Sequence, residues 1–184
     1  MEFKNRKIDG REIAVIFATM AAGCIAAGLY GMLHNQISYT VGPEYFTRFK
    51  FAQFGFEGMV AVPDRARAAM VGFLASWWMG IPIGLLVVLP GLRHGDWRRM
   101  MKDAFASFAI VIGVAMLSGL CGLLFGYLRT AHLKPALYSD WYVPNHVVHL
   151  RRFLCAGYMH NSSYLGGVLG IPAAWLFQFS RKAP

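Results

Sequence analysis

Long apolar segments recur along the chain and alternate with segments that hold most of its polar residues. Four of them, at residues 13–33, 70–92, 104–128 and 161–179, contain no Asp, Glu, Lys or Arg. Each is close to the ~20 residues that a helix needs to cross a hydrocarbon layer of ~30 Å. The pattern predicts an all-α, polytopic membrane protein with four transmembrane helices.

The composition agrees with a single membrane domain over residues 1–184. Hydrophobic residues make up 57% of the chain and charged residues 15%, whereas soluble domains have roughly 25% charged residues. The net charge of +9 does not indicate nucleic acid, because the basic residues collect in short segments beside the apolar runs. The partner that we expect for this surface is a lipid bilayer.

Basic residues are densest before the first run, between the second and third, and after the fourth. These segments carry Lys4, Arg6, Lys7, Arg11, Arg93, Arg98, Arg99, Lys102, Arg181 and Lys182. Cytoplasmic segments close to a membrane are enriched in Lys and Arg. We therefore expect a multi-pass protein of the bacterial inner membrane, with both termini cytoplasmic and two long outer loops.

The first apolar run resembles a signal peptide in its basic start and in an Ala-Gly-Cys sequence that ends at Cys24. The run continues for nine residues beyond Cys24, and Ala21 stands where a lipoprotein signal prefers Leu, so we expect an uncleaved anchor. Cys24, Cys121 and Cys155 have no CxxC spacing. This disfavours a quinone-linked thiol oxidase, which needs cysteine pairs in its outer loops.

Small residues recur within all four runs, where they permit close approach of helix backbones. GxxxG spacing occurs at Gly80 and Gly84, and again at Gly122 and Gly126. The second and fourth runs share Gly-Ile-Pro at residues 80–82 and 170–172, and each proline should kink its helix. A duplicated helical hairpin and independent small-residue packing both explain this likeness.

Five of the six histidines fall on the predicted outer side. His146 and His149 are three residues apart, so on a helical turn they share one face. His34 and His160, each followed by Asn, end two different runs at the same depth. With Glu44 from the first outer loop, these four histidines are the candidate ligands of an outward-facing metal site for Zn, Cu or Fe.

Two other interpretations of the histidines remain open. Histidines at a membrane interface are often hydrogen-bonded residues without a ligand, and a haem held between His34 and His160 is a further option. The spacing departs from the tight histidine boxes of membrane di-iron enzymes. The sequence thus identifies no catalytic residue and fixes no cofactor.

Aromatic residues are dense in the first outer loop, where cations interrupt them. The rings belong to Tyr45, Phe46, Phe49, Phe51, Phe54 and Phe56. This composition is typical of a segment that lies in the headgroup region with its rings toward the apolar layer. Docking of the rings on a partner protein or on a quinone tail is the alternative.

The same loop carries a recognisable pair of motifs. His34-Asn35-Gln36 followed by Glu44-Tyr45-Phe46 resembles a group of uncharacterised bacterial four-helix integral membrane proteins that combine His-(Asp/Asn)-Gln with Glu-Tyr-Phe. The resemblance covers about thirty residues and implies that His34, Gln36, Glu44 and Tyr45 belong to one local unit. It implies no activity.

Two functions from different classes fit these patterns. No P-loop, dinucleotide-binding fingerprint or nucleophilic triad is legible, and the runs lack the charges that mark ion pathways. The small-residue faces and the aromatic loop favour an accessory or structural subunit that packs against other subunits of a larger membrane complex. The alternative is a small membrane metalloprotein whose outer His and Glu residues bind a metal for catalysis or delivery. Whether the protein is an enzyme stays open.

Overall fold

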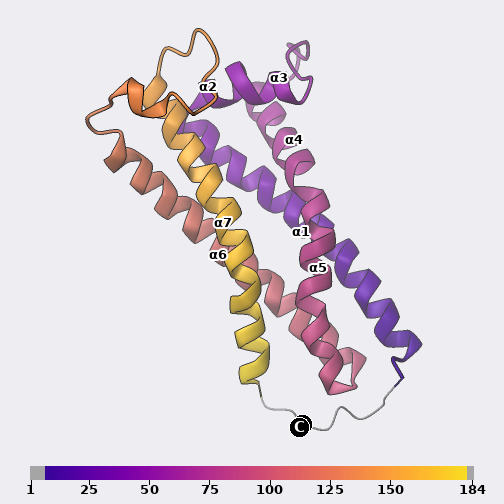
Figure 1. Ribbon diagram of the computed structural model, residues 1–184. Coiled ribbons are helices and arrows are strands. Elements are labelled where there is room, and N and C mark those ends of the chain that lie inside the picture. Colours follow the sequence, from indigo (N-terminus) through magenta and orange to yellow (C-terminus); the bar gives the residue numbers. More distant parts are fainter. Residues whose placement is uncertain (1–6, 182–184) are drawn as a thin grey trace.

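The computed structural model describes residues 7–181, and within them every regular element is helical (Figure 1). Four long rods dominate. They are α1 (Gly10–Val41), a composite rod of α4 (Asp64–Ser76), η2 (Trp77–Met79), α5 (Gly80–Val88) and η3 (Leu89–His94), then α6 (Trp97–Arg129) and α7 (Leu150–Ser180). The shorter elements are α2 (Pro43–Tyr45), η1 (Phe46–Lys50), α3 (Phe51–Gln53) and η4 (Pro135–Tyr138). The all-α prediction is confirmed.

Three rods are long and apolar enough to cross a membrane: Gly10–Val41, Asp64–His94 and Trp97–Arg129. The fourth, α7, has the length but is less apolar, so the structure alone does not establish it as a crossing. All four rods are longer than the apolar runs that predicted them. α7 begins at Leu150, eleven residues before the predicted start at Asn161, because polar turns of a helix carry no hydropathy signal.

The rods form two antiparallel hairpins, α1 with α4–α5 and α6 with α7 (Figure 1). The end that holds the start of α1, the α5–α6 turn and the end of α7 is called the basal end here. The opposite end, which carries α2, α3 and η4, is the apical end. The described chain therefore begins and ends on the same side of the bundle.

Glycines set the closeness of the first hairpin. A Cβ on Gly80 would clash with the backbone of Gly23 and Cys24, and a Cβ on Gly72 would clash with the carbonyl of Gly31. The composite rod contains the 3₁₀ turn Trp77–Met79 just before Pro82. Proline has no backbone N–H, so one helical hydrogen bond is missing next to this turn. The predicted small-residue contacts are thus real helix–helix contacts.

Glycines also allow the two helices of the second hairpin to pack closely. A Cβ on Gly122 would clash with the side chain of Ser162, and one on Gly166 would lie 2.5 Å from the Cβ of Ser118. α7 continues as a helix through Pro172. Both hairpins owe their tight backbone packing to glycine, as expected for helices that associate without a hydrophobic driving force.

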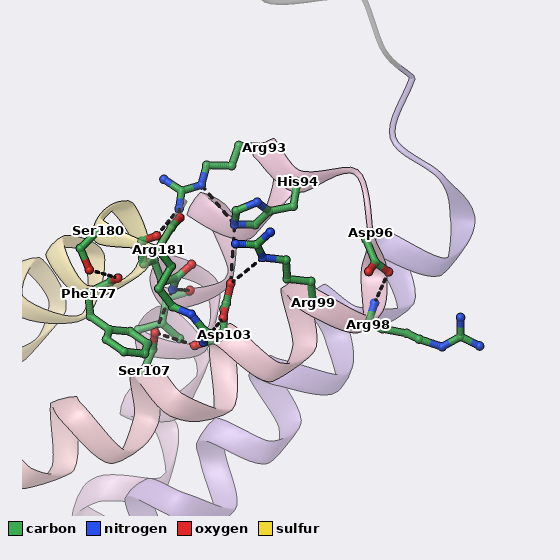
Figure 2. A network of polar contacts seen from close by, with 12 residues as sticks. Arg93, His94, Asp96, Arg98, Arg99, Asp103, Ser107, Phe177, Ser180 and Arg181 are labelled. Atoms are coloured by element: carbon green, nitrogen blue, oxygen red, sulfur yellow. Dashed lines mark hydrogen bonds and ion pairs between the residues drawn. The ribbon is translucent and has the colours of Figure 1, made fainter. Parts of the chain in front are cut away.

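A buried polar network joins the elements of the basal end (Figure 2). Asp103 of α6 is completely buried. Its Oδ1 accepts a 2.7 Å hydrogen bond from Arg181, which follows α7, and its Oδ2 lies 3.8 Å from Nε of Arg99 and 3.5 Å from Nε2 of His94. One carboxylate therefore draws the end of α7 and the α5–α6 turn onto α6.

A second layer of the network lies deeper in the bundle. Gln178, also completely buried, donates hydrogen bonds of 2.6 Å to the carbonyl of Val87 and 2.8 Å to the hydroxyl of Ser107. Arg93 donates to the carbonyls of Gln178 and Arg181. These bonds fix α7 against both α5 and α6 at the basal end.

Candidate functional site: a cavity between two helical hairpins

A cavity of about 350 Å³ lies between the two hairpins. Its walls come from α1, the α4–α5 rod, α6 and α7, and residues of η1 and α3 lie at its apical end. Most of its lining is apolar, including Ala26, Ala27, Val71, Ile83, Phe108, Val111, Ile112 and Ala115. Pockets of this size with apolar walls are typical of small-molecule sites.

The cavity is open on its side. Leu74, Trp78 and Tyr164 line it, yet their exposed fractions are 43%, 54% and 46%. A Cβ on Gly167, which also lines the cavity, would meet no atom within 4 Å. These residues lie along helices rather than at their ends, so the opening faces the surface that the apolar rods present to lipid.

Two histidines meet at the polar end of the cavity. The rings of His34 on α1 and His160 on α7 lie 4.6 Å apart, edge to face. His160 is hydrogen-bonded through Nε2 to the hydroxyl of Ser38 at 3.1 Å, and the ring of Tyr45 stacks on it at 4.8 Å. The Nε2 atom of His34 is buried and lacks a hydrogen bond of good geometry. Its neighbour is the backbone carbonyl of Met159 on α7.

Hydroxyl groups extend this polar region along the wall. The hydroxyl of Tyr30 on α1 is hydrogen-bonded to that of Ser163 on α7. The ring of Tyr30 lies 5.8 Å from His34, and Tyr164 lies 6.5 Å from His160. Tyr30, Ser163 and Tyr164 all line the cavity. Hydrogen-bonding groups from α1 and α7 therefore converge on one end of an otherwise apolar space.

Lys50 adds a positive charge at the apical end. Its Nζ donates a 2.9 Å hydrogen bond to Oε1 of Gln53 and lies 4.5 Å from the centre of the Phe49 ring. Burial lowers the pKa of Lys50, since removing water disfavours the charged amine. The cation thus sits among rings, partly withdrawn from solvent.

The aromatic segment that carries Lys50 packs inside the protein. Tyr45, Phe46 and Phe51 are nearly fully buried, in a cluster with Phe153 of α7 and Val71 of α4. This corrects the expectation that the rings of this segment point into the headgroup region of the membrane. Burial of the rings against α4 and α7 is what holds Lys50 and Gln53 over the cavity.

The predicted metal ligands do not come together as one group. His34 and His160 are in contact, whereas Glu44 lies beside His149 at the start of α7. Within residues 7–181, no three His, Cys, Asp or Glu side chains are arranged to hold a metal ion. The five candidates therefore divide into two pairs and a single exposed His146.

His146 and His149 do not share a helical face. Residues 146–149 precede α7 and are not helical, and His146 has a left-handed backbone with φ of 66°. The expectation of a helical pair at this position is wrong, because the chain makes a turn before it starts α7.

Glu44 caps α7 instead. Its carboxylate accepts backbone hydrogen bonds from Val148 at 3.0 Å and His149 at 2.6 Å, and lies 3.4 Å from Nδ1 of His149. Burial acts to raise the pKa of Glu44, but the two backbone N–H donors and His149 outweigh it, so the pKa is lowered. A carboxylate at a helix N-terminus stabilises the helix, so the role of Glu44 here is structural.

The remaining motif residues tie α1 to α4. Asn35 donates a 2.9 Å hydrogen bond to the carbonyl of Ala68, and Gln36 donates one of 3.0 Å to the carbonyl of Arg65. The motif that begins at His34 therefore contacts α4 and α7 from successive positions of one helix. It positions the apical ends of three rods around the cavity.

Lys50, Gln53, Tyr30, Ser163 and Tyr164 are cavity residues that the sequence did not single out. A cation within a run of aromatic residues is a usable signal for Lys50, since such a run tends to become buried. The others carry no such signal, because their meeting depends on how α1 and α7 pack.

Comparison with known proteins finds no matching family model, no matching curated protein and no matching solved structure. The cavity and its polar end are therefore the observations from which a function is argued.

Proposed function

We propose that this protein binds a small amphiphilic molecule of the bilayer in the cavity between its two hairpins. The observation that carries this proposal is the cavity itself: about 350 Å³, apolar along its walls and polar at one end. A binding site needs apolar area for affinity and a few placed polar groups for orientation. This cavity has both in the arrangement that an amphiphile requires.

The side opening supports a ligand that arrives through lipid. Trp78 and Tyr164 are about half exposed on the surface that the apolar rods present. A molecule dissolved in the bilayer would pass between them without entering water. Its apolar part would then contact Val71, Ile112 and their neighbours, and its polar part would reach the histidines.

The polar end supports recognition of a head group. His34, Asn35 and Tyr30 line one end of a cavity whose other walls are mostly apolar. A head group that hydrogen-bonds to these residues would leave the rest of the ligand against the apolar walls. Because the polar residues lie at one end of the cavity, the head group of the ligand would point toward that end.

We further propose that α7 is the fourth membrane crossing, with the basal end in the cytoplasm of a bacterial inner membrane. In support, α7 packs against α6 through glycine contacts, and at the basal end Arg99 and Arg181 contact Asp103 while Arg93 donates to the end of α7. A surplus of arginine beside the membrane is typical of the cytoplasmic side.

The two functions predicted from sequence stay predictions. An accessory subunit is compatible with the exposed apolar side chains, which serve contact with lipid equally well. A metalloprotein has the His34 and His160 pair in its favour, but zinc takes three or four protein ligands. Elemental analysis of the purified protein tests the second, and identification of chains that co-purify tests the first.

The proposal is tested with a neutral brominated probe, 11-bromoundecan-1-ol, added to the full-length protein in nanodiscs of diacyl phospholipid. Bromine quenches tryptophan fluorescence on contact, and Trp78 lines the cavity, so a variant that keeps Trp78 and replaces the other tryptophans with Phe reports occupancy. We expect saturable quenching, whereas quenching by probe dissolved in lipid rises linearly.

Two matched glycine variants complete the test. Gly167→Leu places a side chain into the open cavity, while Gly113→Leu places the same side chain on an exposed face of α6 outside the cavity; neither Cβ meets an atom within 4 Å. We expect Gly167→Leu to abolish saturable quenching and Gly113→Leu to preserve it. Equal saturable quenching in both variants, or none in the unmodified cavity, would overturn the proposal.

A further inference from the structure

The charge at the cavity is of one sign. Lys50 is the only Lys or Arg among its lining residues, and that lining includes no Asp or Glu. Within the described part of the chain Lys50 forms no ion pair with a carboxylate; its hydrogen bond goes to the neutral oxygen of Gln53. The Lys50 cation therefore lies at the end of an apolar space whose lining provides no negative charge to pair with it.

The surroundings of Lys50 favour pairing with a ligand over simple exposure to water. Its Nζ lies 4.5 Å from the Phe49 ring and 5.6 Å from the Tyr45 ring. Cations gain only modestly from aromatic faces, and a partly desolvated charge is costly unless it is paired. An anion at the end of the cavity would supply the missing partner.

Gln53 would assist in binding such an anion. The Oε1 atom of Gln53 accepts a hydrogen bond from Lys50. The Nε2 group of the same Gln53 side chain can then donate a hydrogen bond to the anion. Lys50 lies between the buried rings of Phe46 and Phe51, Gln53 follows them, and both Lys50 and Gln53 line the cavity. A compact anionic group would thus meet one charged donor and one neutral donor.

We propose that the ligand is a single-chain amphiphile with an anionic head group, whose charge pairs with Lys50 while its chain lies in the apolar cavity. This inference rests on the proposed function. The volume limits the ligand: about 350 Å³ is near the lower end of the ~300–1,000 Å³ typical of ligand pockets. One chain fits this space better than the two chains of a phospholipid.

The test compares three labelled probes with the same chain on the full-length protein in nanodiscs of zwitterionic diacyl phospholipid. Oleate carries a carboxylate, oleoyl lysophosphatidate carries a phosphate, and oleyl alcohol is neutral. Lys50→Met removes the charge and keeps most of the side-chain volume. Lys134→Met, at an exposed position outside the cavity, is the matched control.

We expect Lys50→Met to weaken binding of oleate, lysophosphatidate or both by about tenfold, and to leave oleyl alcohol binding unchanged. The probe that loses more identifies the head group as carboxylate or phosphate. Lys134→Met should leave all three affinities as they are.

Two results would overturn the inference in distinguishable ways. Equal affinity for oleyl alcohol and both anions, unchanged in Lys50→Met but lost in Gly167→Leu, would refute the anionic head group and preserve the cavity as a binding site. Failure of every probe to bind saturably would refute the cavity as well.

Discussion

At the residue scale, the polar residues of the two sequence motifs and of α7 have two different roles. His34 and His160 meet beside the cavity and line it. Asn35 and Gln36 instead bond to the backbone of α4, and Glu44 bonds to the backbone just before α7. A polar side chain that satisfies a backbone group stabilises the fold, whereas a side chain that lines the cavity can contact a ligand.

Glu44 gives a pH-dependent prediction. Its pKa is lower in the folded protein than the usual 4.5, so its stabilisation is present at neutral pH and is lost as the pH falls through the folded pKa. Glu44→Gln keeps an acceptor but removes the charge. We expect the variant to lose about 0.5–1 kcal/mol of stability at pH 7.

The measurement is thermal unfolding in detergent from pH 7 down to pH 3. The gap in melting temperature between the natural protein and Glu44→Gln should close as the pH falls below the usual range for Glu. A gap that stays constant across this range would show that the charge at residue 44 does not stabilise the start of α7.

At the element scale, apolar runs predicted the rods well and their ends poorly. The apolar part of α7 was visible in the sequence, but its first turns carry Arg151, Arg152 and other residues without a hydropathy signal. The GxxxG pairs at Gly80 and Gly122 identified real contacts, since both sit against a neighbouring helix. Which helix each glycine faces could not be predicted, because it depends on tertiary packing.

Glycine packing gives the second prediction. In Gly80→Ala the new methyl group would clash with the backbone of Gly23 and Cys24, which cannot rotate away. We expect the free energy of unfolding to fall by about 1–3 kcal/mol and α1 to separate from α5. Thermal unfolding and protease sensitivity measure these two effects. Gly113→Ala is the control, since its methyl group meets nothing. Equal stability of the two variants would contradict the packing described for the first hairpin.

The basal network gives the third prediction. Asp103→Asn removes the carboxylate that accepts from Arg181 and lies beside Arg99 in this network, so the end of α7 should loosen from α6. We expect the free energy of unfolding to fall by about 1.5 kcal/mol. The effect is small because the Arg181 side chain is half exposed. Thermal unfolding checks the size of the effect.

A matched change tests its specificity. Asp140→Asn removes a carboxylate from an exposed loop at the apical end and should leave the melting temperature unchanged. A similar loss in both variants would mean that overall charge, rather than the basal network, governs stability.

At the scale of the whole molecule, the sequence predicted the all-helical class but not the cavity. The cavity forms because two glycine-packed hairpins meet closely at the basal end and enclose space farther along. Its lining comes from residues far apart in the chain, such as Tyr30 and Ser163. No local pattern encodes such a space.

The number of crossings is the fourth prediction. With a cysteine-free background, Glu57→Cys and Ser180→Cys place thiols near the apical loop and at the basal end of α7. We expect a membrane-impermeant maleimide added to spheroplasts to label Glu57→Cys only, and Ser180→Cys only after permeabilisation. Labelling of both thiols in intact spheroplasts would show that α7 does not cross, and labelling of Ser180→Cys alone would show that the orientation is reversed.

The most direct test of the central claim is mass analysis of what the protein retains when purified from its native membrane in a mild detergent. The cavity predicts about one single-chain amphiphile per chain in the natural protein, absent from Gly167→Leu and retained in Gly113→Leu. An identical lipid content in all three preparations, with no enriched single-chain species, would contradict a binding function for the cavity.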